Sequence, residues 1–434
     1  TEPNMVLSNQ EYKVVGTRPI RPDGADKVTG KARYAADTNL PGLLFGRVLR
    51  SPHAHARIKS IDTSKAAALP GVRAVVTSAD IVEPTGRASE LSEGAMVNYK
   101  FLSNNVLATD KALYKGHAIA AVCASNTHIA EQALKLIEVE YEVLPPVMNA
   151  KDAMKADAPL LHDRLASMTT ATIRAGGVLD DNDPTKGSNL ANKFEFQLGD
   201  LDKGFAEADF IVEKETSTVA VHQGYIEPQS GTAQWHEDGT LTVWSSSQGH
   251  FTVRDYTARL MGVPVSQVKA VPMEIGGGFG AKLTMYAEPI AAALARKAGA
   301  PVKVTMTRTE VFEATGPTSG TFITVKMGVT KDGRITAADA KMIFEAGAFP
   351  GSPVVGGAQC IMSAYDIPNG RIEGYDVVVN RPKTSAYRAP GSPAAAFCIE
   401  TVIDELAEKI GMDPVDFLSL IHISEPTRRT PISY

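Results

Sequence analysis

Hydrophobic and polar positions alternate along much of this chain with a period of two, which is typical of β-strands, and a few stretches change to helical spacing. In the first third of the chain, strands are predicted at 44–49, 74–77, 118–124 and 137–143. A helix is predicted at 127–136, and Pro145 and Pro146 end the strand that follows it. These elements predict one compact α/β domain at residues 18–145.

A polar stretch separates this domain from a longer one. Residues 146–195 are rich in Asp, Asn, Gly and Thr and lack periodicity, so they predict a connecting loop. Beyond residue 196, strands are predicted at 210–221, 231–235, 241–246, 268–271, 302–306, 321–330, 335–344 and 372–379. Helices are predicted at 251–261, 285–298 and 394–409. The pattern therefore predicts a mixed α/β domain at 196–418.

The helical pattern stops after residue 418. In the last predicted helix, one face carries the apolar residues Ala396, Ile399, Val402, Ile403, Leu406 and Ile410, and Gly411 is a stop signal. Residues 419–434 do not continue this pattern, and we interpret them as a non-native tail of the kind that read-through into a sequencing adaptor produces. We therefore expect a C-terminally truncated chain whose natural sequence continues beyond residue 418.

Composition narrows the classes of partner. The chain has 434 residues, 44% of them hydrophobic and 21% charged, as in ordinary globular proteins, and its net charge of −5 argues against a nucleic-acid or anionic-membrane partner. No apolar run reaches the roughly 20 residues of a membrane span, and no export signal opens the chain, so we expect a cytoplasmic location. The three cysteines lack the spacing for an iron–sulfur cluster and are expected to be buried thiols.

Four glycines around one aromatic residue form the most distinctive segment. Gly276, Gly277, Gly278 and Gly280 surround Phe279 between a predicted strand and a predicted helix. Bare backbone can approach an anionic ligand closely, and a helix starting near residue 283 would add its N-terminus to the site. The order G-G-G-F-G matches neither the dinucleotide-binding pattern nor the P-loop, so this loop alone leaves open a tight turn without a ligand.

Other segments together with the glycine loop resemble a known family. They are 245–254, which contains Gln248, 384–391, which contains Arg388, and the N-terminal runs 21–34 and 49–57. With the glycine loop, the first two resemble the molybdopterin-binding large subunits of the xanthine dehydrogenase and aldehyde oxidase family, the molybdenum hydroxylases. The N-terminal runs resemble the α/β hammerhead domain of that family. The resemblance covers about residues 18 to 417.

The resemblance implies a fold and an activity. The fold is α/β (α+β), with a hammerhead domain followed by the first part of a mixed α/β molybdopterin-binding domain. The activity is the hydroxylation of an aldehyde, aromatic or N-heterocyclic substrate with oxygen from water, on a molybdopterin-type cofactor that is either the plain form or the cytosine dinucleotide. Because this chain has no iron–sulfur cysteines, a small 2Fe-2S subunit and a medium FAD subunit are expected as partners.

The resemblance also assigns roles to single residues. Gln248 would hydrogen-bond an oxo ligand of the metal, and Arg388 would lie beside cofactor and substrate. The loop from Gly277 and Gly278 to Gly280 would contact the cofactor, with the Phe279 ring closing the pocket. No side chain would ligate the metal directly. The family's general-base glutamate, near the C-terminus of full-length members, matches no residue here, so the catalytic base is expected beyond the truncation and the fragment is expected to be inactive alone.

Two substrate-pocket positions depart from the purine-oxidising branch. Leu283 replaces a glutamate of that branch, and Pro390 replaces a substrate-stacking aromatic residue. A pocket without these groups should bind a polar purine poorly. The carbon monoxide branch has a cysteine in the arginine segment, and this chain has none there. An aldehyde, an aromatic acyl thioester and an N-heterocycle remain open as substrates.

A non-catalytic protein that binds a nucleotide or phosphate metabolite through the glycine loop is the alternative function. Such a protein would need an acid for the ribose about 20 residues past the loop. Residues 298–304 contain no acid.

Overall fold

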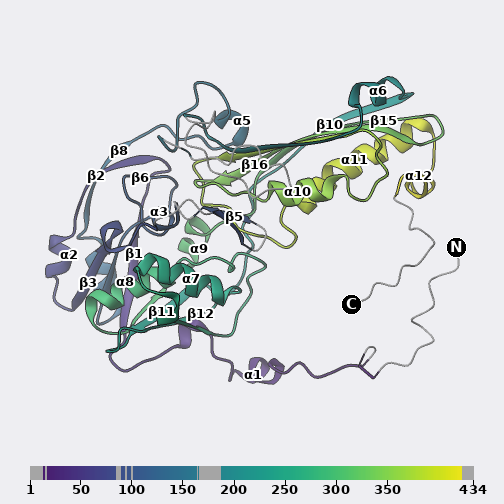
Figure 1. The fold of residues 1–434 in the computed structure, drawn as a ribbon. Helices are drawn as coiled ribbons and strands as arrows, with labels where there is room; N and C mark the ends of the chain where they lie inside the picture. The colour runs from purple at the N-terminus through teal and green to yellow at the C-terminus, as the bar shows by residue number, and fades with distance from the viewer. Residues whose placement is uncertain are drawn as a thin grey trace.

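Two mixed β-sheets organise the protein (Figure 1). The computed structural model describes residues 13–14, 17–84, 89–92, 95–98, 101–163, 165 and 187–422. The larger sheet has the strand order β13-β12-β11-β14-β1-β7-β3. Its strands are β1 (Leu44–Arg50), β3 (Val72–Thr77), β7 (Ala118–Ala124), β11 (Ser230–Trp235), β12 (Leu241–Ser245), β13 (Val268–Pro272) and β14 (Val302–Thr305).

The larger sheet joins the two blocks that the sequence predicted as separate domains. β1 pairs in parallel with β14, with Leu44 opposite Val302 and Gly46 opposite Val304. The helices α7 (His250–Met261) and α8 (Glu288–Ala298) contribute to one hydrophobic core that also contains Leu44. The strands β1, β7 and β3 of the first block therefore share one sheet with strands of the second block, through the pairing of β1 with β14.

The smaller sheet has the order β10-β15-β16-β17-β9. Its strands are β9 (Leu190–Leu198), β10 (Phe210–Thr218), β15 (Thr321–Val329), β16 (Ile335–Gly347) and β17 (Gly370–Val378). The helices α10 (Val354–Ile361) and α11 (Ser392–Ile410) lie along one face (Figure 1). β16 and β17 are parallel, and α10 lies in the crossover between them, as parallel strands require.

Shorter elements surround these sheets. Two small sheets consist of β2 (Ala56–Asp62), β6 (Lys111–Ala112) and β8 (Glu138–Val143), and of β4 (Ser89–Ser92) and β5 (Ala95–Asn98). The remaining helices are α1 (Gly24–Thr29), α2 (Ser64–Ala68), α3 (Leu102–Val106), α4 (Thr127–Leu134), α5 (Ala150–Ala153), α6 (Leu201–Ala206), α9 (Arg308–Ala314) and α12 (Pro414–Ile421). Among the described helices, none combines the length and apolar character needed to cross a bilayer.

Several predicted element boundaries are wrong. α5 and the start of β9 lie inside the predicted loop 146–195, of which 164 and 166–186 fall outside the described residues. Helix α8 begins at Glu288 rather than at 283 or 285, because Pro289 lacks the N–H that an earlier start would require. In α11, Ala396 is exposed and Ala395 is buried, so the apolar face is shifted by one residue at its first turn.

The C-terminal helix α12 extends past the predicted boundary at residue 418. Phe417 and Ile421 are buried in the core shared with α11, and Asp366 N donates to Ile421 O at 2.9 Å. Residues 423–434 fall outside the described residues, and a non-native origin for 419–434 stays a prediction. The expectation of three buried thiols is also wrong in one case, since Cys360 is exposed.

Candidate functional site

The glycine loop, residues 276–282, is held closely against other parts of the protein. A Cβ atom on Gly276 would lie 2.5 Å from Glu227 Cβ, and one on Gly278 would lie 2.4 Å from Gln248 Oε1. A Cβ atom on Gly280 would lie 2.6 Å from Ala386 O. Glycine is therefore required at these positions because the protein's own groups approach the loop closely. The sequence analysis had explained the glycines by the close approach of a ligand.

Gln248 fixes the middle of this loop. Its Oε1 accepts hydrogen bonds from Gly280 N at 2.9 Å and Lys282 N at 3.3 Å, and its own backbone N donates to Lys282 O at 2.8 Å. Because backbone N–H groups can only donate, the amide oxygen must face the loop. The Nε2 group of this exposed side chain is therefore the donor that Gln248 can offer to a ligand.

Three consecutive backbone amides in the loop have no acceptor among the described residues. They belong to Gly277, Gly278 and Phe279. The backbone φ angles of Gly277 and Phe279 are +98° and +54°, and successive amides in such irregular turns form an anion-binding concavity. Gly280 N, in contrast, donates to Gln248 Oε1, and the predicted contact of Gly280 with the cofactor stays a prediction.

The arginine loop, residues 384–391, lies directly against the glycine loop. Arg388 N donates to Phe279 O at 3.0 Å, and Ser385 Oγ donates to Gly280 O at 3.4 Å. Both Phe279 and Arg388 are exposed, so neither side chain is a core anchor. The structure therefore brings Gln248, Phe279 and Arg388 into one place, although they lie up to 140 residues apart in the sequence.

A cavity of about 450 Å³ adjoins Arg388. Its walls are mainly apolar and include Val219, Phe344 and Phe397, with the hydroxyls of Thr318 and Ser319. Neither Leu283 nor Pro390, the two predicted substrate-pocket residues, belongs to its lining. Pro390 instead directs its carbonyl at α10, where a Cβ atom on Gly356 would lie 2.7 Å from that oxygen.

The helix N-terminus that was predicted to adjoin the glycine loop lies further along the chain, because α8 begins at Glu288 and not near residue 283. The first turn of α8 holds the buried Glu288, whose carboxylate accepts from Tyr286 N at 3.0 Å and from the Ser245 hydroxyl. A carboxylate at this position already satisfies the partial positive charge of the helix end. It would repel a phosphate, which also weakens the alternative of a nucleotide-binding protein.

The buried Lys282 forms an ion pair with the partly buried Glu227, and sequence reasoning missed this pair. Lys282 Nζ lies 2.6 Å from Glu227 Oε2 and 5.0 Å from the centre of the Tyr225 ring. Burial lowers the pKa of the fully buried Lys282 ammonium, and the Glu227 carboxylate opposes that shift. The two residues are distant in sequence and no local pattern marks either, so no signal in the chain could have identified the pair.

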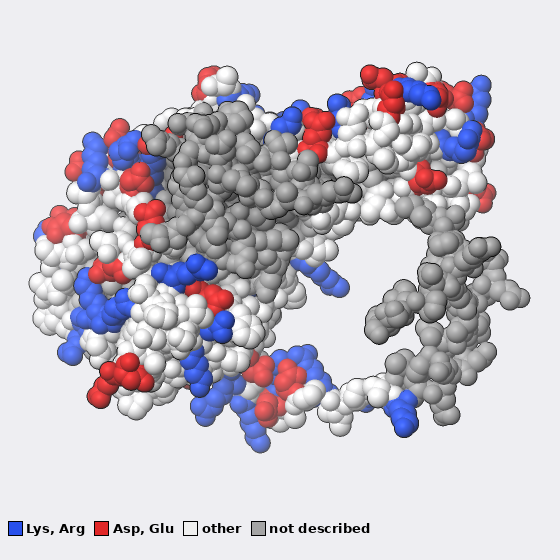
Figure 2. Space-filling view, in the orientation of Figure 1, with Lys and Arg blue, Asp and Glu red and all other residues white. Residues whose placement is uncertain are grey.

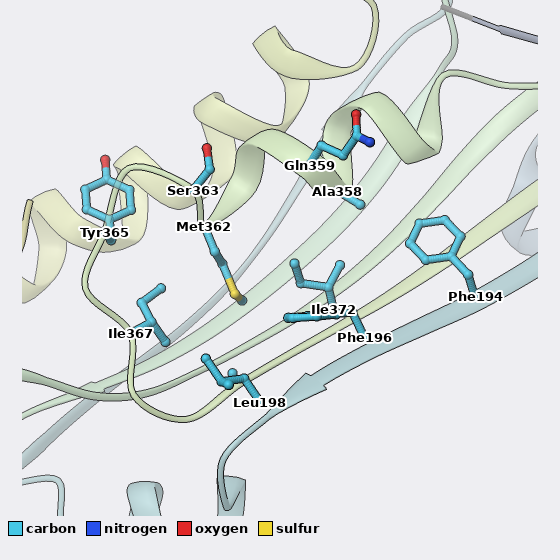
Figure 3. Close-up of a pocket in the computed structure, with 11 residues that line it drawn as sticks. Phe194, Phe196, Leu198, Ala358, Gln359, Met362, Ser363, Tyr365, Ile367 and Ile372 are labelled. Carbon is cyan, nitrogen blue, oxygen red and sulfur yellow. The ribbon is translucent and has the colours of Figure 1, made fainter. Parts of the chain in front are cut away.

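A second cavity lies among residues of β9, α10 and β17. Figure 3 shows this cavity, of about 300 Å³, whose lining includes Phe194, Phe196, Met362, Ile367 and Ile372. It shares no lining residue with the cavity beside Arg388. On the face shown in Figure 2, basic and acidic side chains are intermixed.

Comparison with known proteins places this arrangement in a family. Residues 182–419 match the molybdopterin cofactor-binding domain, and residues 29–145 match the a/b hammerhead domain of aldehyde oxidase and xanthine dehydrogenase. A probable xanthine dehydrogenase subunit of Bacillus subtilis (strain 168) is 32% identical, over 96% of this chain and 52% of that protein. The nicotinate dehydrogenase large molybdopterin subunit of Eubacterium barkeri is 31% identical, over 94% of this chain and 89% of that protein.

Solved structures agree with this placement. The quinoline 2-oxidoreductase of Pseudomonas putida 86 superposes with a TM-score of 0.81 at 28% identity, over 96% of this chain and 51% of that one. The aldehyde oxidoreductase of Desulfovibrio gigas gives 0.82 at 28% identity, over 95% and 44%. The chain therefore belongs to the xanthine dehydrogenase and aldehyde oxidase family, the molybdenum hydroxylases. It spans about half the length of the Bacillus relative and of these two solved chains.

Proposed function

We propose that this chain is the molybdenum-cofactor subunit of an oxidoreductase that hydroxylates an aldehyde, aromatic or N-heterocyclic substrate with oxygen from water. The observation that carries the proposal is the convergence of three groups of donors: the amides of 277–279, which have no acceptor among the described residues, the Gln248 Nε2 group and the exposed Arg388. Donors of this kind suit a group that carries oxo and phosphate oxygens. The cofactor therefore fits the residues present.

The residues of this chain bind and orient rather than transfer protons. Gln248 and the amides of Gly277, Gly278 and Phe279 would hold the cofactor, and Arg388 would pair with its oxygens or with those of the substrate. When bound, the molybdenum centre supplies the two-electron oxidation in which a substrate C–H becomes C–OH, with water as the oxygen source and two protons released. The catalytic base is proposed to lie on another part of the complete enzyme.

Electron transfer requires further components. The two electrons must leave the molybdenum site, and we propose a small 2Fe-2S subunit and a medium FAD subunit as the partners that accept them. We propose both partner subunits because members of the family have them. On the same basis we propose a cytoplasmic location and a cofactor in either the plain or the cytosine dinucleotide form.

The apolar character around Arg388 favours an aromatic substrate. The cavity there has Val219, Phe344 and Phe397 in its walls, and these side chains can contact an aromatic ring. Relatives named for nicotinate and quinoline carry heterocycle names, whereas the Desulfovibrio relative is named for aldehydes. An N-heterocycle with a small polar substituent fits apolar walls with one arginine at the rim.

Metal content and isotope labelling test this function. The complete protein, produced with its neighbouring subunits in a host that makes molybdenum cofactor, should contain about one molybdenum per chain by elemental analysis. Incubated with quinoline or nicotinate and an electron acceptor in ¹⁸O-labelled water, it should give a labelled hydroxylated product. A molybdenum-free protein that binds nucleotides in calorimetry would instead establish the alternative function.

A further inference from the structure

The segment 222–227, between β10 and β11, contacts both loops of the candidate site. Gln223 Nε2 donates to Ala386 O in the arginine loop at 2.9 Å, and Glu227 Oε2 accepts from Gly276 N in the glycine loop at 2.7 Å. We propose that 222–227 is a positioning segment that sets both cofactor loops, and that Glu227 is its decisive residue. This inference rests on the proposed function of the loops.

Glu227 holds both ends of the glycine loop. At the first end, Glu227 and Gly276 are joined twice, since Glu227 N also donates to Gly276 O at 3.1 Å. At the other end, the same Oε2 atom binds Lys282 Nζ at 2.6 Å. The carbonyl of Lys282 accepts from Gln248 N, so the ion pair also fixes the Gln248 segment. The three amides of 277–279 lie between these two fixed ends, which determines their direction.

Gln223 acts at the place where the arginine loop contacts the glycine loop. Gln223 is buried, and the Ala386 carbonyl oxygen to which it donates is the atom that a Cβ on Gly280 would meet first, at 2.6 Å. Arg388 follows two residues later and donates its N–H to Phe279 O. A shift of Gln223 would therefore move both Arg388 and the Phe279 end of the amide cradle.

The segment is itself anchored to α9 and the residue that follows it. Arg308 donates to the carbonyls of Tyr225, at 2.9 Å, and Ile226. His222 Nε2 lies 2.8 Å from Thr315 Oγ1, and Tyr225 OH lies 3.1 Å from the same hydroxyl. These contacts give the segment a rigid base, as a positioning role requires.

A purely structural role for this ion pair is the competing explanation. Removing one charge leaves the other buried without a partner, which destabilises any fold and tests nothing about the loop. Replacing both charges avoids this problem. Glu227→Gln with Lys282→Met keeps an oxygen acceptor for Gly276 N, whereas Glu227→Leu with Lys282→Met removes it. The two double variants therefore differ only in the group that positions the loop.

The test measures molybdenum content and hydrogen–deuterium exchange of the loop in the complete protein. Both double variants lack the ion pair with Lys282, so they are compared with each other and not with the wild type. The Glu227→Leu double variant should contain about tenfold less molybdenum than the Glu227→Gln double variant, the equivalent of one lost hydrogen bond, and its amides of 276–282 should exchange faster. Equal retention and equal exchange in the two variants would overturn the inference.

A glycine substitution covers the case in which both double variants fail to fold. Gly276→Ala keeps both charges but forces the loop away from Glu227, where its new Cβ would clash. Gly24→Ala, at a site where a Cβ meets only ordinary contacts, is the matched control. Only Gly276→Ala should speed exchange and lower molybdenum content, and unchanged values would refute the positioning role. A wild type without molybdenum would instead refute the proposed function, whereas the exchange comparison would still report on the loop.

Discussion

At the scale of single residues, the site depends on groups with two tasks. Gln248 uses its oxygen to hold two amides of the glycine loop and leaves its nitrogen as a donor. Phe279 lies in the left-handed region of backbone conformation, which is unusual for a residue with a side chain. Its carbonyl oxygen accepts a hydrogen bond from Arg388 N. Such residues explain why the loop is fixed before any ligand binds.

Substitutions at Gln248 should separate its two tasks. Gln248→Ala removes both acceptor bonds and should lower the free energy of unfolding by about 1–2 kcal/mol in urea denaturation. Gln248→Glu keeps the acceptors but has no N–H donor, so it should unfold like the wild type. Turnover of the loaded Gln248→Glu enzyme should fall by about 100-fold, the usual effect of losing one donor at a reacting group. If Gln248→Ala were as stable as the wild type, the two hydrogen bonds would not hold the loop.

At the scale of elements, the pairing of β1 with β14 joins the two predicted domains. Gly46 permits it, because a Cβ atom there would lie 2.5 Å from Val304 Cγ2 and 3.2 Å from Leu294 Cδ1. Valine is stiff about its first side-chain torsion, so it cannot rotate away at low cost. The spacing of these two strands therefore depends on one absent methyl group.

Gly46→Ala should destabilise the protein by about 1–3 kcal/mol through overpacking. The measurement is the midpoint and slope of urea denaturation followed by circular dichroism. Combining it with Val304→Ala should cost less than the sum of the two single changes, because the clash partner is then gone. Strict additivity would show that Gly46 is not constrained by Val304.

The sequence predicted strongly patterned elements and missed those whose signal is spread over distance. β7 was predicted at its observed bounds because all seven of its residues are buried and apolar. The first part of β9 was missed although Phe194 and Phe196 alternate with polar residues, because the preceding run rich in Asp, Asn, Gly and Thr led us to interpret residues up to 195 as a loop. The glycine loop and Arg388 could be singled out from the sequence. The role of Glu227 could not, because it depends on contacts with Lys282 and Gly276, which are distant in the sequence. Whether the predicted site residues bind the cofactor stays a prediction.

At the scale of the whole molecule, the shared sheet should make both blocks fold as one unit. The hydrophobic core around it draws residues from 44 to 304. Isolated residues 18–145 would lack β14, leaving the paired edge of β1 open and part of that core exposed.

A fragment of residues 18–145 should therefore show no cooperative unfolding transition. The longer piece 18–422 should unfold in urea with a sigmoidal transition that includes probes in both blocks. Near-ultraviolet circular dichroism includes the tyrosines of the first block, such as Tyr114, and tryptophan fluorescence reports on the second block through Trp235 and Trp244. A stable, cooperative 18–145 fragment would contradict this view of the shared sheet.

The parallel partner of β1 also has a consequence for protein synthesis. Val302 emerges from the ribosome long after Leu44, and at about 5–20 residues per second the delay amounts to tens of seconds. During this time one edge of a nascent apolar strand is open to neighbouring chains. Arg47 and Arg50 place two positive charges on the unpaired β1 strand. In the folded protein Arg47 donates to Thr305 O and Arg50 donates to Glu310. They would discourage the nascent chain from aggregating before its partner strand has been translated.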